Sequence, residues 1–406
     1  MIREMAYDIL EMCMTNLKLT DEPDLSDIVE KVIKHPNARV KTVAVRFVEK
    51  NLSHCPALHN IGTLSLFIEC LKSSEVSVGI PSIQILSELL SGNLLSDPSV
   101  KQQLLSALET SDETVALRIY SIAVGVARKD AASLDKIEFL LEKCVNDVAK
   151  SDVLVMMNVL EVLKDLCLES YGLVYLENKG VFDKLMKKIE NIEEDPMAGI
   201  LVPGLMKFFG NVAIVFPDKI FNAYPALIQT LFTCIFSDDF LLLYTALDTL
   251  GNLARFDDGK RALDSLDGDQ CMKVLQHIAK AIPIYPSELK IRALNCFEHI
   301  FHIDAGSVGN NQINYICQKW FGGIFGLNLA ALLNFCHNPF EDIAMSAFKV
   351  LRSLCSHDFG LNGVAATGKF QKSIDFSILL KFFFIQVDSS NFFSTETQKL
   401  VTTSNK

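Results

Sequence analysis

One pattern recurs along most of the chain: a strongly apolar helical stretch followed by a short polar corner. The apolar stretches can be aligned with one another, and successive stretches begin 38, 37, 40, 46, 41, 47 and 54 residues apart. They cover residues 44–48, 82–86, 119–123, 159–163, 205–209, 246–250, 293–297 and 347–351. A period near forty residues with two or three helices per unit is typical of armadillo and HEAT repeats. The sequence therefore predicts an all-α superhelical solenoid of about eight armadillo/HEAT-like repeats.

Acidic or polar corners stand directly before the long apolar stretches. Asp112-Glu113, Ser151-Asp152 and Asp238-Asp239 occupy such places, where side-chain oxygens can accept hydrogen bonds from the first turn of a helix. Shorter helices are expected between the long ones, over residues 64–71, 100–108, 134–148, 226–236 and 271–281. Because one pair of helices cannot bury its apolar faces alone, we expect each repeat to cover the next.

The composition fits such a stack and excludes several other classes of protein. The chain has 406 residues, which is more than one compact core normally holds, and half of them are hydrophobic. Only 20 Gly and 12 Pro are present, which disfavours a β-sandwich or barrel with its many turns. The net charge of −11 gives no bulk attraction to nucleic acid or to anionic membranes. We therefore expect neither as a partner.

The cysteines and the most apolar window point to a cytoplasmic protein. Eleven cysteines are scattered through apolar stretches without a CxxC pair, as expected of small hydrophobic side chains in a reducing compartment. Residues 197–216 are the most membrane-like, but Pro203, Gly204 and Lys207 lie near the centre of this window. A charge at that depth is costly in a bilayer, so we interpret the window as a buried repeat helix.

No motif in the sequence predicts chemistry. Residues 363–370 have the spacing of a phosphate-binding loop, but Phe370 stands where a Ser or Thr hydroxyl is required and no strand precedes. Cys296, His299 and His302 lie within one predicted helix and lack the paired short spacings of a zinc site. No GxSxG nucleophile motif occurs. We predict no catalytic, cofactor-binding or metal-binding residues, and hence no enzyme.

Polar residues on otherwise apolar long helices are the candidate partner-binding residues. They are Lys207, Asn211, Asp248, Asn252, Glu288, Lys290 and Arg292. Two interpretations are open: these side chains are ordinary solvent-facing positions, or they line a concave groove, where solenoids place their contacts.

Four stretches of the sequence resemble one known family. Asp195-Pro196 with residues 201–213, then residues 286–294, 319–321 and 339–350, are similar in order and spacing to the 26S proteasome non-ATPase regulatory subunit 5 family. The resemblance covers about residues 25–358. It implies a chaperone that assembles the base of the proteasome regulatory particle, holds the C-terminal domain of a proteasomal ATPase subunit in a concave groove, and leaves the mature particle.

The resemblance also implies a cytoplasmic protein, with the nucleus as a further location, that binds regulatory-particle base intermediates and is otherwise monomeric. An alternative is an armadillo-type adaptor or transport scaffold that binds peptides of other partners. The chain has a single tryptophan, Trp320, and lacks the Trp–Asn ladder of such peptide carriers.

The resemblance suggests two domains. Residues 1–358 are expected to form the solenoid, with N-terminal repeats missing relative to the family. Residues 359–406 are expected to form an atypical, poorly structured tail.

Overall fold

The computed structural model describes residues 2–16, 25–110, 112–149, 152–190, 197–304, 310–326 and 329–366. Within these ranges every regular element is an α-helix or a 3-10 helix, which confirms the all-α prediction. The chain divides into two compact units, residues 1–254 and residues 255–406. The division falls at the end of helix α15, and each unit is described by itself.

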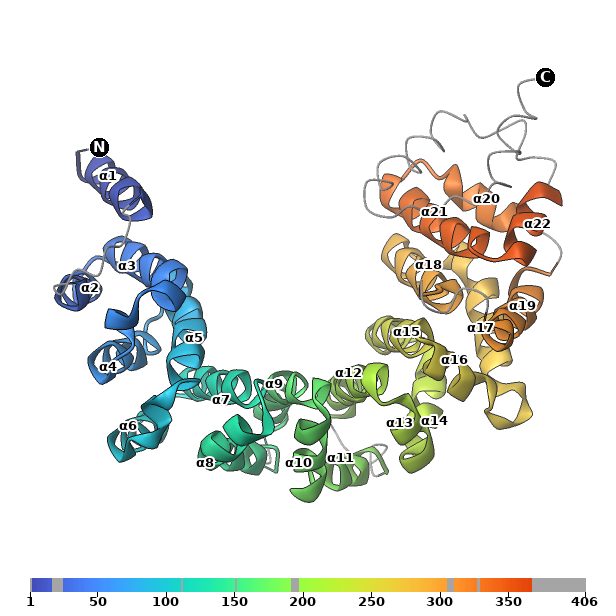
Figure 1. Cartoon of the computed structure of the whole chain (residues 1–406). Coiled ribbons are helices and arrows are strands. Elements are labelled where there is room, and N and C mark those ends of the chain that lie inside the picture. The colour runs from blue at the N-terminus through green and yellow to red at the C-terminus, as the bar shows by residue number, and fades with distance from the viewer. Residues whose placement is uncertain are drawn as a thin grey trace. The chain divides into compact units, whose positions relative to one another are not determined.

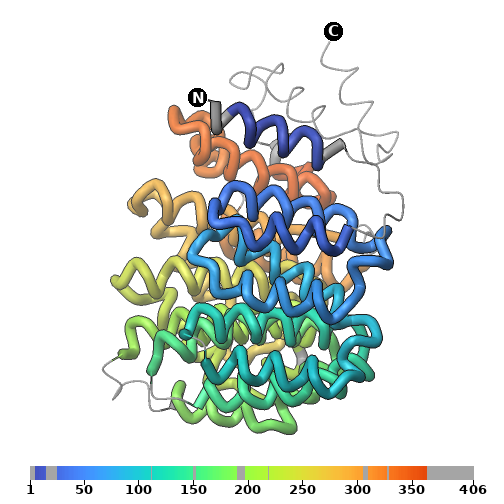
Figure 2. Tube along the Cα trace, turned by 90° about the vertical axis from the view of Figure 1, so that its left-hand side faces the viewer, coloured from blue at the N-terminus to red at the C-terminus, as the bar shows by residue number. Residues whose placement is uncertain are grey.

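Unit 1 consists of two layers of helices (Figures 1 and 2). Layer A holds the long helices, each in contact with the next: α1 (Ile2–Asn16), α3 (Ala38–Asn51), α5 (Val76–Leu90), α7 (Glu113–Ala127), α9 (Val153–Leu163), α12 (Ala198–Val215) and α15 (Phe240–Arg255). Layer B holds α2 (Leu25–Ile33), α4 (Ile61–Cys70), α6 (Pro98–Glu109), α8 (Ala131–Asp147), α10 (Ser170–Asn178), α11 (Val181–Glu190), α13 (Pro217–Ala223) and α14 (Pro225–Ile235). The stacked pairs confirm the predicted helical-repeat solenoid.

Short 3-10 helices complete the corners. They are η1 (Leu52–His54), η2 (Pro56–Leu58), η3 (Asn93–Ser96), η4 (Leu166–Leu168), η6 (Asp267–Asp269) and η7 (Ile282–Ile284). The predicted caps are present as well: the Asp112 carboxylate accepts a hydrogen bond from the Val115 N–H (2.9 Å), and that of Asp152 accepts one from the Leu154 N–H (2.8 Å).

Neighbouring helices of layer A run parallel and nearly in register. Their contacts join residues that lie 35 to 47 positions apart in the chain. The pairs are Thr42 with Ser77, Gly79 with Arg118, Ser87 with Gly125, Met157 with Gly204, and Gly210 with Thr249. Consequently the N-terminal ends of these helices all lie along the same edge of the layer.

The centre of unit 1 contains an aromatic cluster beneath α12. Phe209 is fully buried, and its ring centroid lies 5.6–5.8 Å from those of Phe182, Phe208 and Tyr224. These rings come from α11, from α12 and from the corner before α14, so the cluster joins three elements. By length and composition α12 could cross a membrane. Its packing against α9, α13 and α14 is that of a core helix of the repeat stack.

Unit 2 continues the same helix-on-helix packing. Its helices are α16 (Asp257–Asp264), α17 (Gln270–Ala281), α18 (Ser287–Phe301), α19 (Asn311–Phe325), α20 (Ala330–Cys336), α21 (Glu341–Cys355) and α22 (Asp358–Ala366). Helix α18 packs along α21, while α16 and α17 both pack on α19 (Figure 1). Trp320, Phe297 and Phe301 are fully buried between them.

The last helix lies partly in the stretch expected to be a tail. Helix α22 packs on α21 and begins at Asp358, and residues 363–366 of the phosphate-loop-like stretch are helical. Residues 367–406 lie outside the described residues, so the character of the tail stays a prediction.

Candidate functional site: the exposed face of layer A

Each helix of layer A leaves one stripe of side chains uncovered. On α12 this stripe includes the exposed Lys207 and the half-buried Asn211, one turn apart. On the neighbouring α15 it includes the exposed Asp248 and the half-buried Asn252, again one turn apart. The structure therefore places four of the predicted partner-binding residues on one face of unit 1.

The other three predicted residues lie on α18 in unit 2. The Arg292 Nη2 donates a hydrogen bond to the Glu288 carboxylate (3.1 Å); the Glu288 side chain is exposed and that of Arg292 is half-buried. Lys290 follows two positions after Glu288, which is about 200° around an α-helix. It therefore projects toward the side that buries Leu289 and Ala293. The predicted set thus falls into two groups in separate units, with Lys290 on a different face from Arg292.

A shallow groove lies between α9 and α12 in unit 1. Its volume is about 270 Å³, and it is lined by Met157, Asn158, Leu160, Glu161, Lys164, Ile200, Gly204, Lys207 and Phe208. A Cβ atom on Gly204 would lie 1.9 Å from the Met157 sulfur, so the Met157 side chain packs directly against the glycine.

Glu161 is the charged centre of this groove. Its carboxylate pairs with Lys207 (3.0 Å) and with Lys164. Partial burial raises the pKa of Glu161, but hydrogen bonds from Lys164 and Lys207 outweigh burial and hold it below its ordinary value. Since Glu161 and Lys207 are about half exposed, their pair orients Lys207 and contributes little to stability. Sequence reasoning found Lys207 but missed Glu161, because their contact joins residues in two different repeats.

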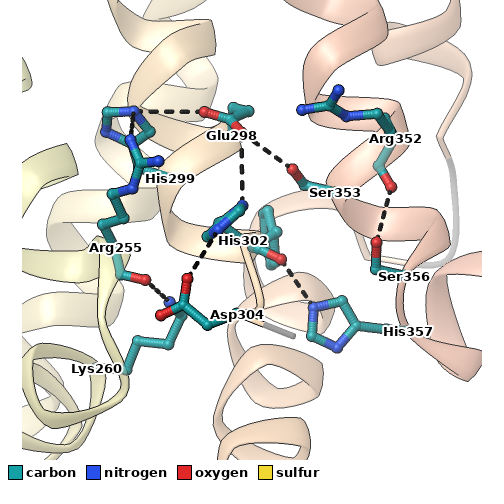
Figure 3. A network of polar contacts seen from close by, with 11 residues as sticks. Arg255, Lys260, Glu298, His299, His302, Asp304, Arg352, Ser353, Ser356 and His357 are labelled. Carbon is teal, nitrogen blue, oxygen red and sulfur yellow. Dashed lines mark hydrogen bonds and ion pairs between the residues drawn. The ribbon is translucent and has the colours of Figure 1, made fainter. Parts of the chain in front are cut away.

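A second polar arrangement, the α18 cluster, occupies unit 2 (Figure 3). It comprises Arg255, Lys260, Glu298, His299, His302, Asp304, Ser353 and His357. His302 Nε2 lies 3.2 Å from the Asp304 carboxylate, and Ser353 donates a hydrogen bond to Glu298 (3.4 Å). These contacts connect α18 with α21 and with the segment after α18.

His357 and Lys260 each donate a hydrogen bond to a backbone carbonyl at the end of a helix in this cluster. His357 is buried, and its Nε2–H donates to the Phe301 carbonyl at the end of α18 (2.9 Å). Burial lowers the pKa of His357 and of His299, so both rings are neutral at pH 7. Lys260 is completely buried, and its ammonium donates to the carbonyl of Arg255 (2.7 Å), the last residue of α15. Unpaired carbonyls at a helix C-terminus attract such cationic donors.

The contacts of the α18 cluster link helices and helix ends of unit 2 to one another. Among the residues that the structure describes, no three His, Cys, Asp or Glu side chains are grouped as metal ligands. His299 and His302 each lie next to an acidic partner, and Cys296 is buried in the core.

Replacing Lys260 with methionine should stabilise unit 2 at neutral pH. Burial lowers the pKa of Lys260 from 10.5 to about 8. Between these two pH values the unfolded chain binds more protons than the folded chain, so stability should rise with pH across this window. Below pH 8 the buried charge costs about 3 kcal/mol, and methionine removes that cost while losing a hydrogen bond of about 1–2 kcal/mol.

Urea denaturation at pH 7, 8, 9 and 10, followed by the fluorescence of the single Trp320, measures this effect in unit 2. We expect the wild type to gain stability above pH 8 and Lys260→Met to lack that gain. An identical pH dependence in both proteins would show that Lys260 is not charged and buried at neutral pH.

Comparison with known proteins assigns the chain to a family. A model of the family described as proteasome non-ATPase 26S subunit matches residues 3–378. The chain belongs to this family. It is 28% identical over 375 residues to the 26S proteasome non-ATPase regulatory subunit 5 of Drosophila melanogaster, covering 90% of this chain and 73% of the relative. It is 26% identical over 345 residues to the subunit of the same name from Homo sapiens, covering 81% and 67%.

A solved structure of the karyopherin Kap121p bound to a C-terminal segment of the phosphatase Cdc14p is also similar, with a TM-score of 0.49 and 11% identity, over 86% of this chain and 39% of that one. A similarity of this strength carries no conclusion about function.

The sequence stretches that resemble the proteasome non-ATPase 26S subunit family are mostly packing segments. Residues 201–213 form most of α12, where Gly204 and Gly210 allow close contact with α9 and α15. Residues 286–294 begin α18, and Trp320 is buried on α19. In this chain the stretches that carry the resemblance therefore lie largely in the packed stack of helices.

Proposed function

We propose that this protein is an assembly chaperone for the base of the 26S proteasome regulatory particle. It binds the C-terminal domain of a proteasomal ATPase subunit, holds base intermediates and leaves the mature particle. The family match over residues 3–378 carries this proposal, because the relatives are named as proteasome regulatory subunits. The protein acts in the cytoplasm, with the nucleus as a further location.

The exposed face of layer A supports the proposal physically. It presents side chains of both signs, among them Glu161, Lys207 and Asp248, on a rigid stack of parallel helices. Such a face can hold a folded domain by many moderate contacts without reacting with it. The mechanism is steric and stoichiometric: the bound chaperone occupies the surface of the ATPase domain until a later assembly step displaces it.

The direct test is a pull-down of the full chain from a cell extract, followed by mass spectrometry and by titration calorimetry with purified ATPase C-terminal domains. We expect proteasomal ATPase subunits, but no mature core particle, in the bound fraction. Absence of every proteasomal ATPase from the bound fraction would overturn the proposal. Recovery, in their place, of other proteins bound through short peptide segments would favour the adaptor alternative.

Charge reversal on α18 should weaken binding of the ATPase domain without unfolding the chain. We expect Arg292→Glu to reduce affinity about tenfold, because the substitution reverses a half-exposed charge and breaks the pair with the exposed Glu288. Lys290→Glu should have a smaller effect, since Lys290 projects toward the buried side. Calorimetry measures the affinities and circular dichroism checks the fold. Equal affinities for the wild type and both variants would remove α18 from the binding site.

A further inference from the structure

The exposed face of layer A carries an apolar side chain near the beginning of the long helix in five consecutive repeats of unit 1. These residues are Ile80 on α5, Leu117 on α7, Leu154 on α9, Ile200 on α12 and Leu241 on α15. Ile80 and Leu117 are the fifth residues of their helices, whereas Leu154, Ile200 and Leu241 are the second or third. Because the helices are parallel, the row follows one edge of the layer and shifts by about one helical turn between α7 and α9. We call this row the apolar ladder.

The ladder is open to solvent along most of its length. Ile80 is 52% exposed, Leu154 58%, Ile200 43% and Leu241 54%, while Leu117 is half-buried. Single exposed apolar residues are common on protein surfaces, but a contiguous series marks an interaction site. Phe240 and Val76, also exposed, widen the row at its two ends.

An acidic margin runs beside the apolar ladder at the beginnings of the same helices. Its exposed carboxylates are Glu75, Asp112, Glu113, Asp152, Asp238 and Asp239. Asp112, Asp152 and Asp239 accept hydrogen bonds from the backbone N–H groups of their helices, which offsets only part of a full negative charge. Lys72 is the one basic side chain among the described residues of these corners, and it pairs with Glu69 (2.9 Å). The margin is therefore strongly negative.

The spacing of the ladder selects the shape of the partner. Adjacent packed helices lie about 8–10 Å apart, so successive rungs are separated by about that distance. In an α-helix, residues seven positions apart lie on one face and about 10.5 Å apart. In an extended strand, residues on one face are about 6.6 or 13 Å apart, which fits the rungs poorly. A helix laid across layer A with apolar residues every seven positions matches the ladder, and basic residues on one flank match the acidic margin.

We propose that the apolar ladder and its acidic margin bind a basic amphipathic helix of a partner protein. About fifteen residues of such a helix cover three rungs. This binding does not depend on the proposed chaperone function, because the ladder would hold such a helix from any protein.

The test uses a fluorescein-labelled synthetic peptide of 22 residues with Leu at positions 1, 8, 15 and 22, Lys on one flank, and Ala and Gln elsewhere. Fluorescence anisotropy with the full chain should show binding that weakens as salt is raised. Two control peptides carry either Glu in place of Lys or the same residues in shuffled order. Equal binding of the three peptides, or no binding of the first, would overturn the proposal.

Variants of the chain locate the site. We expect Leu154→Ser and Leu241→Ser each to weaken binding of the Lys peptide about fivefold to tenfold, since each removes one rung. The paired change Asp238→Lys with Asp239→Lys should also weaken binding and reduce its dependence on salt. Val174→Ser is the matched control, because Val174 is exposed on α10 in layer B, away from the ladder. A loss with Val174→Ser equal to that with Leu154→Ser would contradict this placement.

Discussion

Replacing Gly172 with alanine should destabilise unit 1 by about 3 kcal/mol. A Cβ atom at this position would lie 2.2 Å from the Leu166 carbonyl oxygen and 2.8 Å from the Leu166 side chain. The carbonyl belongs to the backbone of η4 and cannot move aside without shifting the start of α10. The expected result is a melting temperature lower by about 6–12 °C, measured by circular dichroism.

Gly360 provides an independent repetition of this experiment in unit 2. A Cβ atom there would lie 2.0 Å from the Leu354 carbonyl oxygen, also six residues earlier in the chain. Gly360→Ala should therefore destabilise unit 2 and change the fluorescence transition of Trp320.

The matched control is Gly199→Ala in α12. No atom lies within 4 Å of a Cβ built on Gly199, so alanine should leave stability unchanged or raise it by about 0.5–1 kcal/mol through its better helix propensity. Equal stability of the Gly172→Ala and Gly199→Ala variants would contradict the close contact between η4 and α10.

The repeat period predicted the architecture because it reflects packing between neighbouring repeats. The short helices expected over residues 100–108 and 226–236 match α6 and α14 to within a few residues. The 46-residue step contains two layer B helices, α10 and α11, between α9 and α12. They are separated by Gly180, whose φ of 67° is readily reached by glycine.

Buried cations could not be predicted from the sequence pattern. Arg118 and Lys260 lie in helices, where charged residues are expected at the surface. In the structure the guanidinium of Arg118 donates to the carbonyls of Leu71 and Ser73 (2.8 Å to Ser73), and Lys260 donates to the carbonyl of Arg255. Each cation thus satisfies free carbonyls near the end of another helix. For Arg118 these carbonyls lie 45 and 47 residues earlier, and nothing in the local sequence indicates them.

The candidate site was predicted only in part for a similar reason. Lys207 and Asp248 were singled out as polar residues on apolar helices, and both are exposed in the structure, while their role in partner binding stays a prediction. The apolar ladder escaped notice because Leu154 and Leu241 resemble core residues until the rotation of each helix is known. Aligning the apolar stretches gives the repeat period. However, shifting the alignment of one helix by a full turn leaves its apolar face unchanged, so the alignment does not fix which residues of the helix are covered. The sequence therefore could not distinguish exposed leucines from buried ones.

Replacing Phe209 with alanine should strongly destabilise unit 1. Phe209 is fully buried and contacts three other aromatic rings, from α11, from α12 and from the corner before α14. Truncating a buried phenylalanine costs about 3–5 kcal/mol, and the loss of aromatic pairs adds to it. The melting temperature of unit 1 should fall by about 6–20 °C.

Hydrogen exchange should localise this loss, because a repeat stack is stabilised mainly by contacts between nearest neighbours. Amides of α11, α12 and α14 should exchange faster in Phe209→Ala, whereas those of α18 and α21 should keep their protection. The matched control is Phe240→Ala, which removes a ring that is 51% exposed on α15 and should change stability by about 0.5 kcal/mol or less. Uniform loss of protection in both units would show that the chain unfolds as one cooperative body, and equal effects of the two substitutions would contradict the burial of Phe209.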